Sequence, residues 1–226
     1  MIKAIIFDLD NTLIDFWKFK RVSCEAAVDA MIDAGLKMKR EDALDKLYEL
    51  YLEAGLENPQ IFQKFLSEVN GGLDYRMLAY AIVAYRQART GFLRPYPHVK
   101  KMLISMKDRG LKLAIVSDAP RLKVWIRLTV MKLDDFFDVI MGLEDTGKLK
   151  PNPAPFLKAL DLLGVEAGEC LMVGDQPLRD IKGAQEVGMK TAFAKYGFER
   201  QVPEDIKADH DLESIEDLIS IIEDNS

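Results

Sequence analysis

Cysteine and long apolar runs are scarce in this sequence, and each shortage excludes a class of protein. Two cysteines among 226 residues are too few for a disulfide framework, and they lie too far apart in the sequence to form a close-spaced metal pair. We expect Cys24 and Cys170 to be small, reduced core residues. Nowhere do about eighteen apolar residues run together, and the first ten residues hold two acids. We therefore expect no membrane span, no secretory signal and a cytoplasmic protein.

An excess of basic residues is also absent. The formal net charge is -6 and the isoelectric point is near 5.1, whereas proteins that bind nucleic acid usually need a basic face. We therefore expect no nucleic-acid partner. The length allows one sizeable core and a smaller second unit.

Three short apolar runs, rich in β-branched residues, each stop at a polar residue. They cover residues 4–7, 111–116 and 170–173, and they stop at Asp8, Ser117 and Gly174-Asp175. Such runs are typical of strands buried on both faces of a parallel sheet. Helical patterns lie between and after them, at 98–109, 121–132, 154–163, 178–187 and 214–222. The alternation predicts an α/β fold, a Rossmann-like doubly wound parallel sheet whose polar residues converge on one edge.

Residues 15–94 break this alternation. They hold three or four amphipathic helical patterns and no convincing strand, and the segment Arg94-Pro95-Tyr96-Pro97 is suited to a stiff return to the core. We therefore expect a core formed by 1–14 and 95–226 and a helical domain inserted at 15–94.

The first polar loop carries two acids, Asp8 and Asp10, directly after a strand. Residues two apart in such a loop can direct their side chains at one centre, as a nucleophile and its acid/base partner must. At about 4 Å two like charges repel by roughly 4 kcal/mol at an effective dielectric constant near 20, so the loop needs a cation or a protonated carboxyl. Asp175 and Asp180 follow another strand and bring further carboxylates to the same edge. Oxygen ligands of this kind favour Mg²⁺ as the cofactor, although either acid could instead cap the following helix.

Ser117 and Lys150 add a hydroxyl and an ammonium. Together with Mg²⁺ they would hold the oxygens of a phosphoryl group during transfer. Each residue is ordinary alone, and Lys148 is the alternative to Lys150 if the loop register differs. A small phosphate ester is therefore the expected substrate.

This combination resembles the haloacid dehalogenase (HAD) superfamily across nearly the whole chain apart from the insert. Asp8-Leu9-Asp10-Asn11-Thr12 is similar to its DxDxT loop, Ser117 to its second motif, and Lys150 in Lys-Pro-x-Pro to its third. Gly174-Asp175 with Asp180 is similar to its acidic fourth motif. The resemblance implies that residues 15–94 form a helical cap of the first type.

The resemblance also implies a role for each site residue. Asp8 would attack phosphorus and form an aspartyl-phosphate, and Asp10 would protonate the leaving oxygen and then activate water. Thr12, Ser117 and Lys150 would hold the phosphate. The implied metal ligands are Asp8, the backbone carbonyl of Asp10, Asp175 and Asp180.

Three alternatives stay open beside a phosphatase. A dehalogenase of the same family also uses an aspartate nucleophile, but its members typically carry an aromatic residue at the position of Asp10. A phosphomutase shares the core and differs in the phosphoryl acceptor. A response-regulator receiver, which is not an enzyme, has similar groups at its strand ends but is usually about half as long.

Two further expectations concern the surroundings of the site. Substrate contacts should come from the insert, and the residues nearest the catalytic loop are the candidates: Phe16, Trp17, Lys20 and Arg21. Asp118 stands where many relatives have Asn; it could orient Lys150, although capping of the next helix is the simpler reading. The sequence does not indicate an oligomeric state.

Overall fold

The computed structural model describes residues 1–198 and 206–224, and these divide into two compact units. Met1–Asp15 and Arg94–Ser226 form the core unit, and Phe16–Leu93 form the helical insert. None of the helices in the described ranges combines the length and apolar character that a membrane crossing needs.

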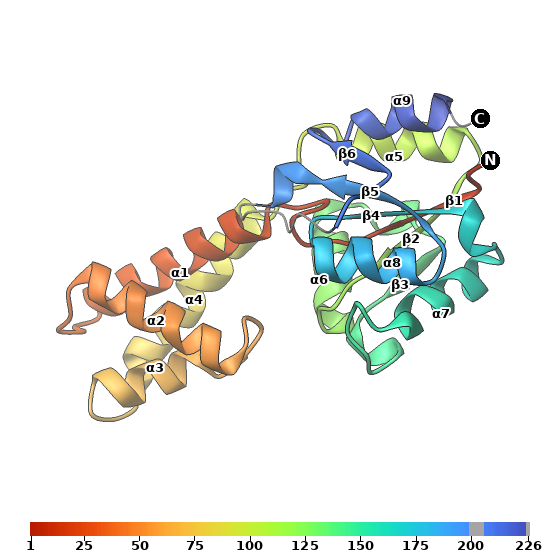
Figure 1. Ribbon diagram of the computed structural model, residues 1–226. Coiled ribbons are helices and arrows are strands. Elements are labelled where there is room, and N and C mark those ends of the chain that lie inside the picture. Colours follow the sequence, from red (N-terminus) through yellow and green to blue (C-terminus); the bar gives the residue numbers. More distant parts are fainter. Residues whose placement is uncertain (199–205, 225–226) are drawn as a thin grey trace. The chain divides into compact units, whose positions relative to one another are not determined.

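The core unit is built on a parallel sheet (Figure 1). Its strands in the described residues are β1 (Ala4–Phe7), β2 (Lys112–Val116), β3 (Val139–Met141), β4 (Cys170–Gly174), β5 (Lys190–Ala194) and β6 (His210–Leu212). The strand order is β3-β2-β1-β4-β5-β6, and every neighbouring pair is parallel. The prediction of an α/β parallel sheet is confirmed, and β1, β2 and β4 are the three strands that the apolar runs predict.

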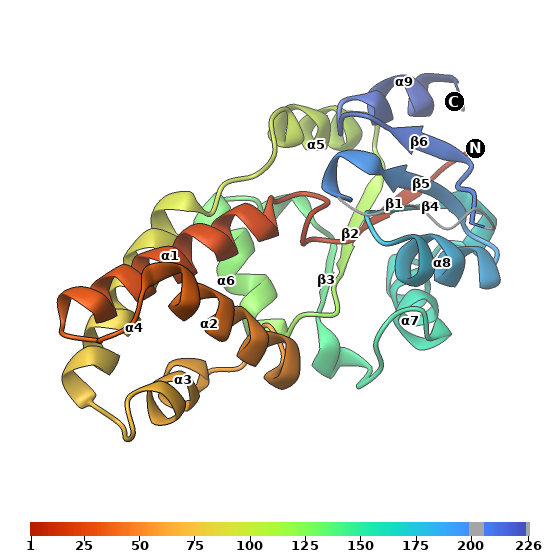
Figure 2. The same ribbon diagram turned by 60° about the vertical axis from the view of Figure 1, so that its left-hand side comes forward.

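Helices cover both faces of this sheet, as Figures 1 and 2 show. They are α5 (Val99–Asp108), α6 (Arg121–Met131), α7 (Pro153–Leu163), α8 (Lys182–Glu186) and α9 (Asp217–Asp224). Helices α5 and α9 lie on one face, and α7 and α8 lie on the other. Phe156 and Leu163 of α7 pack on Ile6 and Met172, so the strands are buried on both sides. The helix expected at 178–187 is present, but it opens with a π-helical turn (Pro177–Ile181) that leads into the short α8.

The sheet reverses its strand order at β1. The chain moves from β1 to β2 and β3 on one side, and later crosses to β4, β5 and β6 on the other. The loops that leave β1 and β4 therefore diverge at the carboxyl edge, where open α/β sheets bind their ligands. This arrangement brings the loops after β1, β2 and β4 to one place.

The helical insert consists of four helices, α1 (Phe16–Asp33), α2 (Arg40–Ala54), α3 (Ile61–Val69) and α4 (Tyr75–Phe92). It has its own hydrophobic core, which includes Val28, Leu47 and Phe65. Helix α4 begins at Asp74, whose side chain accepts hydrogen bonds from the backbone N–H groups of Arg76 and Met77. The insert therefore has a core of its own, although some of its large apolar side chains, such as Leu52 and Phe92, are exposed.

Candidate active site

The loop after β1 is held in a tight turn. The backbone N–H groups of Thr12, Leu13 and Ile14 all donate to the carbonyl of Leu9. Asn11 adopts a left-handed conformation with φ of 61°, which Asn tolerates better than most residues. The turn fixes where the side chains of the two acids leave the backbone.

Lys150 lies at the centre of the site. Its Nζ donates to Asp8 Oδ1 at 2.7 Å and to the carbonyl of Val116 at 2.9 Å, and it forms an ion pair with Asp180 Oδ1 at 2.7 Å. Burial alone would lower the pKa of Lys150, but Asp180 and Asp8 outweigh it and raise the pKa above its ordinary value. Lys148 is exposed, so Lys150 is the lysine that the fold places beside Asp8.

Three carboxylates gather around this ammonium. Asp8, Asp175 and Asp180 are buried, and each offers an oxygen within 4.8 Å of the others. Burial is the main cause that raises the pKa of Asp8 to about 7 and that of Asp175 to about 8, and the neighbouring carboxylates add to both shifts. The site thus holds more negative charge than Lys150 neutralises.

A divalent cation fits this donor set. The ligand atoms are carboxylate oxygens, which suit Mg²⁺, and no His or Cys belongs to the group found among the described residues. A cation would also offset the repulsion among the carboxylates, which adds to the effect of burial on the two pKa values.

Two hydroxyls face the same edge of the sheet. Thr12 is fully buried, and its Oγ1 has no hydrogen-bond partner within the described part of the chain. Ser117 Oγ accepts from the backbone N–H of Ala119 at 3.2 Å, which leaves its own proton as a donor. Because an unsatisfied buried hydroxyl is costly, Thr12 is suited to donate to a bound anion.

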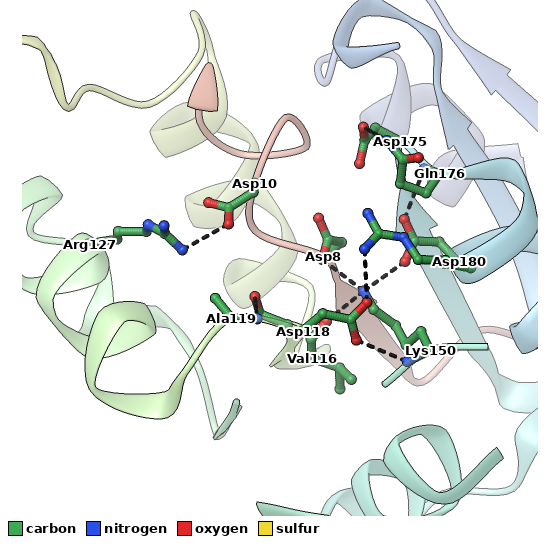
Figure 3. Close-up of polar contacts among 12 residues, drawn as sticks. Asp8, Asp10, Val116, Asp118, Ala119, Arg127, Lys150, Asp175, Gln176 and Asp180 are labelled. Atoms are coloured by element: carbon green, nitrogen blue, oxygen red, sulfur yellow. Dashed lines mark hydrogen bonds and ion pairs between the residues drawn. The ribbon is translucent and has the colours of Figure 1, made fainter. Parts of the chain in front are cut away.

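Asp10 differs from the expectation that the two acids of the loop direct their side chains at one centre. Its Oδ2 accepts from Arg127 Nη1 of α6 at 2.8 Å. Figure 3 shows the Asp10 carboxylate turned toward Arg127 and the Asp8 carboxylate toward Lys150. The two acids of the loop are therefore bound to different cations.

The loop after β2 is tied to the two later loops through Asp118. Its Oδ1 accepts from the backbone N–H of Lys150 at 2.9 Å, and its Oδ2 pairs with Arg179 Nη1 at 3.1 Å. The simpler reading of Asp118 as a helix cap is wrong, because α6 begins at Pro120 with no side-chain cap. Asp118 instead positions the backbone of Lys150.

Asp180 and Gln176 order the loop after β4. Asp180 Oδ2 accepts from the backbone N–H of Gln176 at 2.9 Å, and Gln176 Nε2 donates to Asp175 Oδ2 at 2.5 Å. Gly174 allows this packing, since a Cβ there would lie 2.4 Å from Asp180 Oδ2. Asp180 therefore closes its own turn as well as pairing with Lys150.

The candidate specificity residues of the insert fall into two groups. Phe16 and Lys20 are buried, and Lys20 Nζ donates to the carbonyl of Leu56 at 2.8 Å and lies 3.6 Å from the centre of the Tyr51 ring. Trp17 and Arg21 are exposed. Lys20 thus serves the packing of the insert, and we keep only Trp17 and Arg21 as candidates for substrate contact.

Sequence reasoning missed Arg127, Arg179 and Tyr196. Arg127 had one available signal, since it falls with Val124 and Leu128 on the buried side of α6. A charged residue on a core-facing stripe is rare unless it is paired. Tyr196 Oη donates to the carbonyl of Thr12 at 2.7 Å, and no sequence pattern indicates that contact.

An aspartate after β1, a buried lysine and two further carboxylates lie together at the carboxyl edge of a doubly wound parallel sheet, as the motifs of the haloacid dehalogenase-like hydrolases predict. The model of the haloacid dehalogenase-like hydrolases matches residues 5–194. The chain belongs to this family, as its motifs predict, and to the phosphatase-like branch of it.

Similar proteins support this branch. The chain is 34% identical to a glyceraldehyde 3-phosphate phosphatase of Methanocaldococcus jannaschii, over 98% of this chain and 97% of the relative. It is 31% identical to a phosphoglycolate phosphatase of Aquifex aeolicus, over 98% and 97%. The crystal structure of a HAD phosphatase from Thermococcus onnurineus superposes with a TM-score of 0.70 at 25% identity, over 98% of both chains.

Proposed function

We propose that this protein is a magnesium-dependent phosphomonoesterase that hydrolyses a small phosphorylated metabolite through an aspartyl-phosphate at Asp8. The observation that carries the proposal is the buried group of Asp8, Asp175 and Asp180 around Lys150. Such a group disfavours its own ionisation and is relieved by a cation and a transferable phosphoryl group.

Two steps use the two acids of the first loop. In the first, an oxygen of Asp8 forms a bond to phosphorus, the bond to the leaving oxygen breaks, and Asp10 gives that oxygen its proton. In the second, Asp10 takes a proton from water, the water oxygen attacks phosphorus, and the bond to Asp8 breaks. Inorganic phosphate leaves, and both carboxyl groups return to their starting state.

The remaining residues hold the phosphoryl group. Thr12 and Ser117 donate hydrogen bonds to its oxygens, and Lys150 offsets charge on Asp8 and on the phosphate. Asp8, the backbone carbonyl of Asp10, Asp175 and Asp180 would bind Mg²⁺, either directly or through water. Bound Mg²⁺ supplies positive charge to the phosphoryl oxygens.

The substrate is proposed from the relatives and the insert. A three-carbon sugar phosphate such as glyceraldehyde 3-phosphate is the first compound to test, because that activity names a relative matched over nearly its whole length. Phosphoglycolate is the second, for the same reason. The insert acts as a cap in this proposal, with Trp17 and Arg21 as its substrate contacts.

The alternatives differ in what Asp10 must do. A dehalogenase releases halide, which needs no proton, so an acid at Asp10 favours the phosphatase. A phosphomutase would transfer the phosphoryl group to a second position on the sugar. A receiver would retain the phosphoryl group on its aspartate and would not turn over.

Phosphate release from a panel of phosphate esters tests the proposal. We expect turnover with Mg²⁺, loss of activity with a chelator, and recovery when Mg²⁺ is added in excess. Full activity in chelator would contradict the metal assignment. Isomerised sugar phosphate without free phosphate would indicate a mutase, and a stable phosphoprotein without turnover would indicate a receiver.

A further inference from the structure

Arg127 is the largest side chain that is fully buried within the described residues. It lies on α6, and its Nη1 donates to Asp10 Oδ2 at 2.8 Å (Figure 3). A guanidinium is a delocalised cation. The fold therefore keeps a cation beside the acid that stands two residues beyond Asp8.

Stability alone does not account for this arginine. An arginine is almost never fully buried unless it is paired, and replacing a buried ion pair with apolar residues of similar volume is often neutral or stabilising. Met at position 127 would suit the stripe formed with Val124 and Leu128. The partner of Arg127 thus points to a role in the reaction.

Lys150 cannot take over this role. An ammonium has three donors, and those of Lys150 face three acceptors: Asp8 Oδ1, the Val116 carbonyl and Asp180 Oδ1. Asp10 therefore needs a cation of its own, and α6 supplies it.

We propose that Arg127 is a positioning residue that holds the Asp10 carboxylate where it exchanges protons with the leaving oxygen and with the attacking water. The inference rests on the proposed function. A guanidinium suits the task because its planar fork is pre-organised, so little side-chain freedom is lost when Nη1 holds Asp10 Oδ2. Small displacements of a catalytic group cost large factors in rate.

The role predicts a kinetic signature that depends on the leaving group. An alkyl phosphate needs a proton on its leaving oxygen, whereas p-nitrophenolate leaves without one. Removing Arg127 should therefore slow the first turnover of an alkyl ester and spare the first turnover of p-nitrophenyl phosphate. Hydrolysis of the aspartyl-phosphate uses Asp10 with either substrate, so steady-state turnover should fall for both.

Arg127→Met and Arg127→Lys test this in the full-length protein with Mg²⁺. For Arg127→Met we expect the first turnover of glycerol phosphate or glyceraldehyde 3-phosphate to fall by about tenfold or more, with KM nearly unchanged. The release of p-nitrophenol should become a burst of one equivalent per protein followed by a slow phase, with phosphorylated Asp8 found by mass spectrometry after acid quench. Arg127→Lys keeps the positive charge but lacks the planar fork. Its first-turnover rate with the alkyl ester should lie between those of Arg127→Met and the unmodified protein.

Arg121→Met is the matched control. Arg121 is on the same helix and forms an exposed ion pair with Asp145 at 3.0 Å. This variant should keep the rates and the burst behaviour of the unmodified protein.

A double-mutant cycle distinguishes an effect through Asp10 from a general folding defect. In an Asp10→Asn background a residue that acts through Asp10 has nothing left to position, so Arg127→Met or Arg127→Lys should cause no further loss. Three outcomes would each overturn the inference. The first is an equal loss of first-turnover rate for both esters in Arg127→Met, with no phosphorylated Asp8. The second is an unchanged rate in Arg127→Met, and the third is an additive loss of rate when Arg127→Met is combined with Asp10→Asn. If the unmodified protein hydrolyses none of the esters, the proposed function fails instead.

Discussion

At the scale of a single residue, Asp8 has a raised pKa that opposes the ionisation its proposed role needs. In the proposed reaction Asp8 must be ionised to attack phosphorus, yet burial and the neighbouring acids raise its pKa to about 7. Lys150 lowers the pKa of Asp8 and so favours the reactive form. The metal-free site is therefore held back from full ionisation until a cation joins Lys150.

Asp8→Asn tests the nucleophile. The amide cannot form an acyl phosphate, so we expect phosphate release to fall by roughly a thousandfold or more. The circular dichroism spectrum should be unchanged, because Lys150 keeps its bonds to Asp180 and to the Val116 carbonyl. Turnover of Asp8→Asn near the normal rate would disprove the covalent mechanism.

Lys150→Met tests the ammonium. It leaves Asp8 and Asp180 buried without their shared cation, so we expect a loss of about 3–5 kcal/mol in the free energy of unfolding. Urea titration at neutral pH without metal measures this loss. Lys148→Met is the control, because Lys148 is exposed and should change stability by no more than about 0.5 kcal/mol. A similar loss in both variants would contradict the assignment of Lys150.

At the scale of secondary structure, an unbroken apolar run decided which strands the sequence predicted. β1, β2 and β4 each contain four consecutive apolar residues, whereas β5 begins with Lys190 and Thr191 and was not predicted. β3 and β6 have three residues each, which is too short for a period to show. Their pairing depends on neighbours elsewhere in the chain, which no local pattern reports.

Helix α6 shows why the one signal for Arg127, its spacing with Val124 and Leu128, was too weak to identify it. Val124, Arg127 and Leu128 form its buried side, but Leu122 and Trp125 are apolar and exposed. With apolar residues on both sides, the sequence does not show which face is inside. A lone arginine then reads as a solvated residue. The acids of the loops were predictable because they directly follow strands whose edge the topology fixes.

The turn after β5 packs closely against the loop after β1, and this contact can be tested. A Cβ at Gly197 would lie 1.7 Å from the carbonyl oxygen of Asn11, which belongs to the catalytic loop. Gly197→Ala must displace that loop, so we expect a loss of about 1–3 kcal/mol in stability and a clear fall in kcat. Gly168→Ala is the control, since a Cβ there meets nothing within 4 Å. Phosphate release and thermal unfolding of both variants check this, and an active, stable Gly197→Ala protein would contradict it.

At the scale of the whole molecule, the buried acids couple stability to pH and to metal. The pKa values of Asp8 and Asp175 rise in the folded protein from 3.8 to about 7 and about 8, chiefly through burial. An acid with a higher pKa in the folded state binds more protons folded than unfolded. The free energy of unfolding of the metal-free protein should therefore decrease as pH rises from about 4 to about 8. Lys150 stays charged throughout this range, because its pKa is raised.

Magnesium should reverse this trend. In the proposed site Mg²⁺ binds the ionised carboxylates, so it should compete with protons at low pH and stabilise the folded protein most above about pH 8. We expect the rise in Tm on adding Mg²⁺ to be small near pH 5 and large near about pH 8.5. Thermal unfolding with Mg²⁺ and with chelator at each pH measures the difference. Asp175→Asn removes one ligand and one shifted acid together, so it should reduce both the pH trend and the response to metal. An equal rise in Tm at both pH values in the unmodified protein would show that Mg²⁺ binds away from these three carboxylates.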